Sequence, residues 1–370
     1  DADELAELPV WNEREIHTFL RYRDALGPLI SLHELQAVPG LSLETIRRLR
    51  PFITVDEQEK KYQVPISELI TDGSNEVSLR WQRNLELPRG FLPREDSLPP
   101  AFIGDPNRYY LRYRHTYSNR LSYGLVLEKD PGETLGFDDQ PGADFASVHL
   151  YARALTSWLR HVALGDYNIS LGQGLIQHSG FGRGKNSFIT AIKKGGRVIR
   201  PSASVNETDF FRGGSCSISF LNRWEGTVFA SHRRVDGNLA TDPFDTSGVF
   251  EHFTSLQETG LHRTHSEIDD RNKVKHTALG GRIRYSLNSG SISINALYNN
   301  FSPELQRRKD LYNRYYFNGS SLLNISIDHS YIYENFHLFG EIAHSDNGGL
   351  ATVQGALITL HPRVDLALLF

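Results

Sequence analysis

Residues Glu76–Leu87 read EVSLRWQRNLEL, and their side chains alternate in kind from one position to the next. One face is apolar apart from Arg83, and it carries Val77, Leu79, Trp81, Leu85 and Leu87. The other face carries Glu76, Ser78, Arg80, Gln82, Asn84 and Glu86. Successive side chains of a β-strand point to opposite faces of the sheet. The stretch therefore predicts a strand with one apolar and one polar face.

The same alternation returns along most of the chain that follows. The clearest segments are Arg108–Tyr117, Leu121–Leu127, Ser215–Phe220, Leu279–Leu287, Ser291–Tyr298, Leu323–Tyr333, Phe336–Ile342 and Val364–Phe370. Turn residues such as Asn288-Ser289-Gly290 separate them. We count roughly fourteen candidate strands, most of about 8–12 residues, and this pattern predicts an antiparallel, mostly β region.

Long alternating strands fit either a soluble β-sandwich or an outer-membrane-type β-barrel. A tilted crossing of lipid needs about 9–11 residues per strand, whereas globular strands average about 5–6. Tyr109 and Tyr117 lie at strand ends, as the aromatic girdles of barrels do. Arg112 and Arg282 lie on polar faces, which suits a wet lumen. The mean hydropathy of −0.41 favours the soluble sandwich instead. Strand length and aromatic placement favour the barrel.

The first 55 residues follow a different pattern. ELAELPV at 4–10 and ELQAVPG at 34–40 repeat one phrase thirty residues apart, which predicts two helical hairpins. Asn12 and Ser42 are the expected N-caps, and only Asn12, with Glu15 three residues later, makes a capping-box pattern.

The phrase LQAVPGLS at 35–42, followed by IRRLRPFI at 46–53, resembles the helix-hairpin-helix family in the tandem form of competence-type DNA receptors. The whole layout resembles the helix-hairpin-helix domain-containing proteins of Bacteroidota, through the phrases at 29–40, 164–175 and 260–267. That resemblance implies a small all-α tandem module over 1–55, a linker over 56–75 and an antiparallel β-barrel over 76–370. Since family members extend beyond this length, it also favours truncation at Phe370.

A DNA-binding hairpin holds a phosphate with backbone N–H groups in a glycine-rich turn. Here Gly40-Leu41-Ser42 keeps one glycine, and Val10-Trp11-Asn12 keeps none. Residues 1–55 carry six arginines and nine acidic residues, a net charge of −3, whereas phosphate binding calls for a basic module. We expect this module to dock a partner protein or to be purely structural, with DNA as the alternative. The candidate contact residues are Pro39, Gly40, Leu41, Ser42, Arg47, Arg48 and Arg50.

Two glycine-rich stretches superficially resemble nucleotide sites. The stretch 180–187 lacks the Walker spacing, because Ser179 and Asn186 stand where a glycine and a Ser or Thr are required. Gly172-Gln173-Gly174 fails the dinucleotide spacing. Both are therefore interpreted as turns or barrel bends.

His262 and His265 lie near Glu267, Asp269 and Asp270 in a long polar segment. A metal site can be built from such groups, but the chain has no His-Glu-x-x-His helix and no cysteine pair, so a hydrogen-bonded or solvated cluster is the favoured interpretation. We expect Glu258–Lys275 to be extramembrane or to plug the lumen.

No catalytic constellation emerges, and no metal or cofactor is expected. We predict a non-enzymatic outer-membrane barrel protein, surrounded by lipid, whose periplasmic helix-hairpin-helix module docks an envelope protein. One alternative is a DNA-uptake component that uses the hairpin on phosphates. The other is a soluble β-sandwich ligand binder or enzyme.

Overall fold

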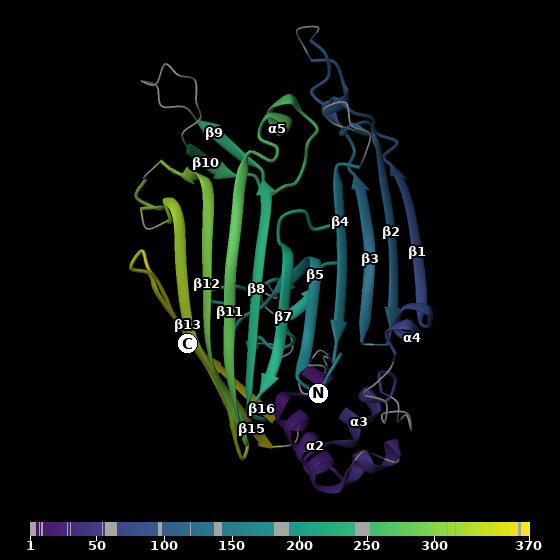
Figure 1. Ribbon diagram of the computed structural model, residues 1–370, viewed down its shortest axis with the longest axis vertical. Helices are drawn as coiled ribbons and strands as arrows, with labels where there is room; N and C mark the ends of the chain where they lie inside the picture. The colour runs from purple at the N-terminus through teal and green to yellow at the C-terminus, as the bar shows by residue number, and fades with distance from the viewer. Residues whose placement is uncertain are drawn as a thin grey trace.

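The computed structural model describes residues 5–370 except 7, 9, 28, 30, 54, 56–64, 95–97, 119, 137–142, 181–191, 241–251, 309, 315 and 362–363. In this part of the chain one sheet of sixteen strands dominates (Figure 1). Its continuous path is β1-β2-β3-β4-β5-β7-β8-β11-β12-β13-β14-β15-β16, with every neighbouring pair antiparallel. The mostly antiparallel β prediction is confirmed.

The strands on the first half of the path are β1 (Ser74–Arg83), β2 (Asn107–Tyr117), β3 (Leu121–Lys129), β4 (Phe145–Arg153), β5 (Leu159–Ile169), β7 (Phe211–Phe220) and β8 (Trp224–Val235). The second half holds β11 (Val274–Leu287), β12 (Gly290–Leu305), β13 (Gly319–Tyr333), β14 (Phe336–Ser345), β15 (Leu350–His361) and β16 (Val364–Leu369). Three short strands lie off the path: β6 (Ile199–Pro201), β9 (Gly237–Ala240) and β10 (His252–Leu256). β1 ends at the Arg83 exception, so Leu85 and Leu87 lie beyond it.

Strand register brings the apolar side chains together on the outer face of the sheet. Ile294 pairs with Ile283 on β11 and with Ile327 on β13, and all three are more than half exposed. The intervening positions face inward, and many of them are polar and buried, as Asn295 and Glu341 show at 0% exposed. An apolar outside and a polar inside are typical of a transmembrane barrel and the reverse of a soluble one.

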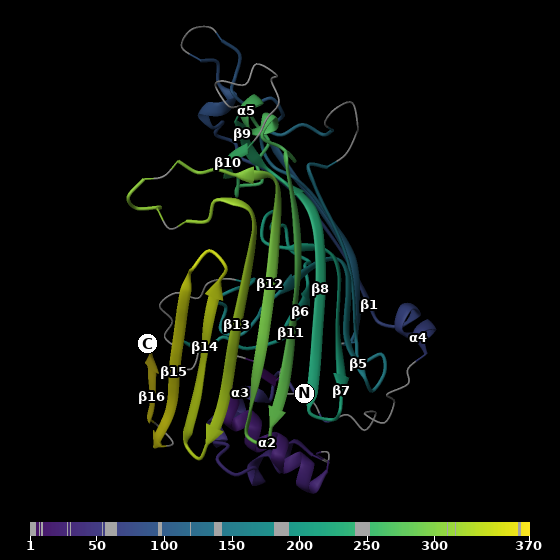
Figure 2. The same ribbon diagram turned by 60° about the vertical axis from the view of Figure 1, so that its left-hand side comes forward.

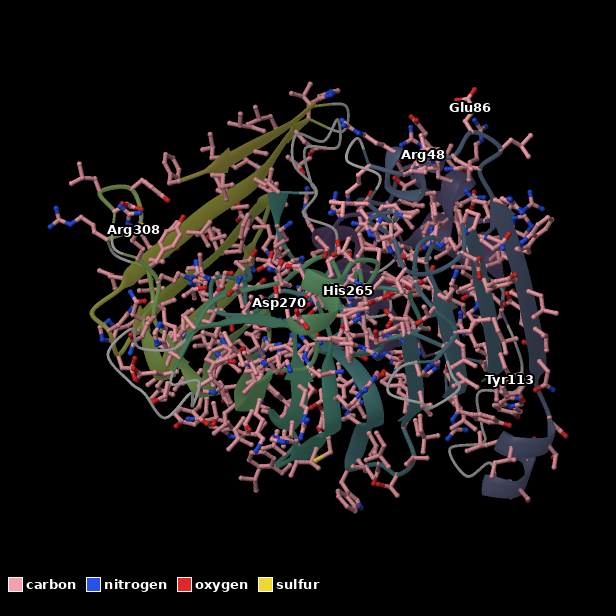
Figure 3. All side chains as sticks on the ribbon, turned by 90° about the horizontal axis from the view of Figure 1, so that it is seen from above. Arg48, Glu86, Tyr113, His265, Asp270 and Arg308 are labelled. Carbon is pink, nitrogen blue, oxygen red and sulfur yellow. The ribbon has the colours of Figure 1, made fainter. Side chains whose placement is uncertain are left out.

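The sheet curves strongly around its own interior (Figures 1 and 2). Viewed from above, the wall runs from β1 round to the last strands, and side chains fill its concave side (Figure 3). Within the described residues β1 pairs only with β2, and β16 only with β15. The barrel wall is therefore curved but not closed over this part of the chain.

The N-terminal helices form their own small core at one end of the sheet (Figure 1). They are α2 (Glu13–Leu26), the 3-10 helix η1 (Leu32–Ala37) and α3 (Leu43–Leu49). Trp11, Ile16, Phe19, Leu35, Val38 and Leu49 make up the buried core. The predicted caps at Asn12 and Ser42 are confirmed, and only the first is a full box with Glu15. A second box, Ser31 with Glu34, starts η1 and was not expected.

A fourth helix, α4 (Ile66–Thr71), falls within the segment predicted as linker and packs on the outer face of the sheet. His115 on β2 contacts the Leu69 carbonyl oxygen through Nε2 at 3.1 Å, and Leu69 is buried with Leu121 and Ala152. The helix therefore covers the end of the apolar face nearest the module (Figures 1 and 2).

The interior is filled by the segment that joins β5 to β7, which we name the plug (described residues 170–180 and 192–210). β6 within it pairs with β5. Its Leu171, Val198 and Ile199 are buried against inward side chains of the wall, including Tyr167 and Phe229. Of the two alternatives expected for Glu258–Lys275, plugging of the lumen does not hold, because that segment lies among the connections at the end of the sheet opposite the module (Figure 1).

Candidate functional site

The second hairpin carries the residues predicted to contact DNA or a partner. Pro39, Gly40, Arg47, Arg48 and Arg50 are exposed, whereas Leu41 and Ser42 are half-buried. Gly40 adopts φ +79°, a turn conformation that glycine accepts without strain.

Two further features define the exposed surface of this hairpin. Arg48 pairs with Glu44 one turn away on α3, which offsets part of the local positive charge. Leu43 and Phe52 stand beside the arginines at 60% exposed each. The surface is thus mixed, apolar and basic, on a module that is acidic overall.

The module is anchored to the sheet mainly through α2. Glu13 pairs with Lys193 of the plug and lies 3.4 Å from His337 Nε2 on β14. Next to it, His17 Nε2 lies 3.1 Å from the Asn288 carbonyl oxygen in the β11–β12 turn. Burial raises the pKa of Glu13, but the charges of Lys193, His337 and Arg284 outweigh it, so the pKa lies below its ordinary value of 4.5. One carboxylate therefore joins the module, the plug and the wall.

Gly172-Gln173-Gly174 forms the turn that starts the plug, and this supports its interpretation as a turn. The Glu341 Oε2 atom on β14 accepts hydrogen bonds from the backbone N–H groups of Gln173 at 2.7 Å and Leu175 at 3.0 Å. Gly172 has φ +52°, and a Cβ there would lie 2.6 Å from the Glu341 carboxyl carbon. The stretch 181–187 lies outside the described residues.

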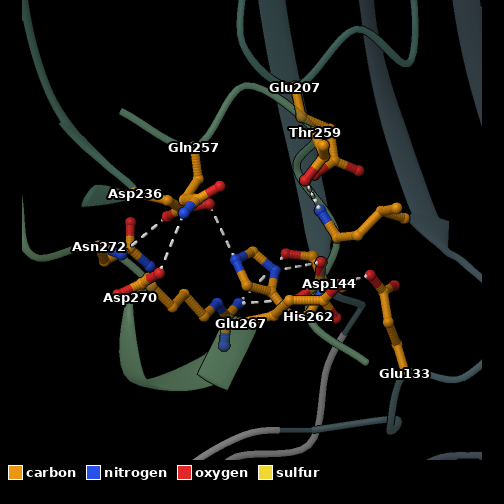
Figure 4. A network of polar contacts seen from close by, with 12 residues as sticks. Glu133, Asp144, Glu207, Asp236, Gln257, Thr259, His262, Glu267, Asp270 and Asn272 are labelled. Carbon is orange, nitrogen blue, oxygen red and sulfur yellow. Dashed lines mark hydrogen bonds and ion pairs between the residues drawn. The ribbon is translucent and has the colours of Figure 1, made fainter. Parts of the chain in front are cut away.

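A polar network occupies the opposite end of the sheet (Figure 4). His262, 6% exposed, stands between two carboxylates. Its Nδ1 lies 2.8 Å from Asp144 Oδ2, and its Nε2 lies 2.9 Å from Asp236 Oδ2. The backbone N–H of His262 donates to Glu133 Oε1 at 2.9 Å. Arg271 Nη2 lies 3.2 Å from Asp144 Oδ1.

Charge governs this network. Burial lowers the pKa of His262, but hydrogen bonds to Asp144 and Asp236 outweigh that effect and raise it to about 10, so the ring is an imidazolium at neutral pH. Burial, and then the Asp144 charge, raise the pKa of Glu207 to about 9. The same two causes raise the pKa of Glu133. Acidic groups are thus crowded beyond what the nearby cations offset.

A cavity of about 590 Å³ opens beside the network. Asp144, Glu207, Asp236, His262 and Arg271 line it, together with Arg212 and Arg233. The two arginines stack over the Phe210 ring, 5.2 and 4.5 Å from its centroid. The cavity can therefore admit a small polar molecule or ion.

Sequence reasoning found only part of this network. His265 and Asp269 are exposed and do not join His262. The residues that do join it, Glu133 and Asp144, lie 129 and 118 positions away in sequence. Their pairing depends on the sheet topology, which no local spacing reveals. The interpretation of His262 as part of a hydrogen-bonded cluster is confirmed.

Comparison with known proteins adds little. No family model and no curated protein matches the chain, so neither supports the resemblance to helix-hairpin-helix proteins of Bacteroidota. Among solved structures, a triple mutant of Rh. blastica porin is 9% identical over 70% of this chain and 83% of its own, with a TM-score of 0.23. A quintuple mutant of that porin is 11% identical over 79% and 93%, also with a TM-score of 0.23. Superpositions this poor carry no inference.

None of the described helices has the length and apolar character needed to cross a membrane.

Proposed function

We propose that the chain is a non-enzymatic outer-membrane protein whose sheet crosses lipid and whose N-terminal module docks an envelope protein from the periplasm. The outer face carries the proposal. Exposed apolar side chains recur on this face from β1 to β16, including Leu79, Val148, Val228, Ile294, Ile327, Ile342 and Leu366. Soluble monomers rarely expose apolar patches beyond a few hundred Å². Hydrocarbon around this face would remove the cost of wetting it, about 25 cal/mol per Å².

The lengths of the connections support the orientation. At the module end, successive strands are joined by only two to five residues, at 118–120, 154–158, 221–223, 288–289, 334–335 and 362–363. At the opposite end, most connections are long, at 84–106, 130–144, 236–273 and 306–318. Outer-membrane barrels have short periplasmic turns and long extracellular loops. The module therefore belongs on the periplasmic side.

The plug favours an anchoring role over that of an open conduit. The buried contacts of Leu171, Val198 and Ile199 with the wall occupy the interior, and Glu341 ties the plug's first turn to β14. Glu13 then ties the module to both. A partner held by the module would be tethered to the membrane through this chain of contacts.

The exposed second hairpin is the surface proposed for docking. Leu43 and Phe52 offer apolar area, and Arg47 and Arg50 flank it with charge. Aromatic and arginine side chains carry most of the binding energy in protein interfaces. Phosphate recognition is less well supported, because the module has a net charge of −3.

Membrane fractionation, followed by a gel run with and without boiling, tests the first half of the proposal. Extraction only by detergent, with a folded band that shifts on boiling, is the expected result. A protein released by buffer alone, without a shift, would favour a soluble sandwich and end the membrane proposal.

Photo-crosslinking in intact cells tests the second half. A crosslinking residue replaces Phe52, and the control replaces Leu311, which is 90% exposed in the 306–318 connection. We expect an envelope-protein adduct from position 52 that weakens with Arg47→Glu and Arg50→Glu. Adducts with nucleic acid instead would favour the DNA-uptake alternative.

A further inference from the structure

We propose that Glu133, Asp144 and His262 form a binding site for one divalent transition cation of the Zn²⁺ class, at the end of the sheet opposite the module. This inference is independent of membrane insertion and of the docking role. It rests on the donor set, on the carboxylate behind the histidine and on a carboxylate oxygen that accepts no hydrogen bond.

The three donors come from segments far apart in the sequence and converge in space. Glu133 and Asp144 both lie in the β3–β4 connection, and His262 follows β10. One ligand atom of each lies within 4.8 Å of the other two. All three side chains are buried, with Glu133 and the Asp144 side chain at 1% exposed. A cation of ordinary bond length, about 2.0–2.2 Å to nitrogen or carboxylate oxygen, fits between such atoms.

The histidine is oriented as a metal ligand would be. Its Nε2 lies 2.9 Å from Asp236 Oδ2, and the other oxygen of Asp236 accepts from the Asn272 backbone N–H at 2.8 Å. Metal-binding histidines usually donate their second ring N–H to a carboxylate in this way, which fixes the tautomer and the ring plane. Nδ1 is thereby directed to Asp144 (Figure 4). Asp236 is a positioning residue.

Asp144 supplies the third observation. Its Oδ1 is buried and accepts no hydrogen bond, although Arg271 Nη2 lies 3.2 Å away. The Arg271 ion pair offsets the charge of this oxygen without a hydrogen bond, so the oxygen keeps a lone pair for a metal bond.

The donor chemistry selects the class of cation. Imidazole nitrogen suits Zn²⁺ and its first-row neighbours, whereas Ca²⁺ and Mg²⁺ prefer oxygen ligands alone. Three protein ligands leave a fourth tetrahedral position, which water fills in open zinc sites. The adjoining 590 Å³ cavity, which Asp144 and His262 line, gives that position access to solvent.

Zinc titration of the full chain in detergent tests the proposal. The protein is stripped with a chelator, titrated with ZnCl₂ by calorimetry and assayed for retained zinc. We expect one equivalent in the wild type, at least a tenfold loss of affinity in Asp144→Asn and Glu133→Gln, and about a 10–100-fold loss in Asp236→Asn. His265→Ala, an exposed histidine three residues from His262, is the matched control and should bind normally.

Two results would overturn the proposal. One is a wild type that retains no zinc or binds Ca²⁺ equally tightly. The other is a loss in His265→Ala as large as that in Asp144→Asn. Each variant is first checked for the folded gel band. If the ligand variants do not fold, Co²⁺ is bound to the wild type in place of Zn²⁺ and its visible absorption spectrum is recorded. The site requires absorption bands typical of mixed nitrogen and oxygen ligands. Their absence rejects the site.

Discussion

Single glycines hold the plug in place, and Gly172 is the most constrained of them. Its φ of +52° lies in the left-handed region, and its missing Cβ leaves room for the Glu341 carboxylate that binds the next backbone N–H groups. Gly348, in the β14–β15 turn, also has a positive φ of +92°, but a Cβ there would meet nothing within 4 Å. Comparing substitutions at Gly348 and Gly172 therefore separates the cost of backbone strain from the cost of steric contact with Glu341.

We expect Gly348→Ala to cost about 1–2 kcal/mol through backbone strain alone. Gly172→Ala should cost a further ~1–3 kcal/mol, because the added methyl group must displace Glu341. Urea unfolding in detergent measures both free energies. Equal losses would show that the Glu341 contact contributes nothing to holding the plug.

The polar network around His262 could be predicted from the sequence only in part. His262 was recognisable as a chemically capable side chain, but its partners Asp144 and Asp236 were not. Their side chains converge only because the connections after β3, β8 and β10 leave the sheet at the same end. A long chain permits many pairings between His262 and distant acidic residues. The actual partners therefore follow only from the three-dimensional fold.

Elements were far more predictable than sites. Strands β2, β3, β7, β11, β12, β13, β14 and β16 all begin or end within a few residues of the alternating segments. Alternation can be recognised within a short stretch of sequence, because each strand has one face toward the outside and one toward the interior. The plug carries no such periodic signal, and the sequence offered a plugging role only as one of two alternatives for another segment, Glu258–Lys275.

The attachment of α2 to the sheet should weaken in acid. The folded-state pKa of Glu13 lies below 4.5, so its contribution to docking is fully present above 4.5 and is lost as the pH falls through the lower, folded-state value. Lys193, His337 and Arg284 are the charges that face it.

Hydrogen exchange of α2 in the full chain measures this attachment between pH 6 and pH 3. Protection of the wild type should fall at the acid end, and Glu13→Gln should show weaker protection that falls less over the same range. Glu44→Gln, which removes an exposed pair with Arg48 on α3, is the control. A fall in Glu13→Gln as large as that in the wild type would assign the pH response to another group.

At the scale of the whole molecule, the outer face distinguishes a membrane protein from a soluble one. Ile294, the fifth residue of β12, is 55% exposed and pairs on the same face with Ile283 and with Ile327, which lies near the middle of β13. An arginine at this depth in lipid costs about 2–4 kcal/mol. In water the same substitution replaces exposed apolar area by a solvated charge and falls within about 0.5 kcal/mol of neutral.

We therefore expect Ile294→Arg to lower the free energy of unfolding in lipid vesicles by about 2–4 kcal/mol, whereas Leu311→Arg, in a connection beyond the strands, leaves it within about 0.5 kcal/mol. Urea titration of both variants, followed by the heat-shifted band, gives the two values. A neutral Ile294→Arg would mean that water, not hydrocarbon, covers the middle of this face. The exposed isoleucines of β11, β12 and β13 would then need a protein partner, because a soluble monomer would not leave so wide an apolar surface bare.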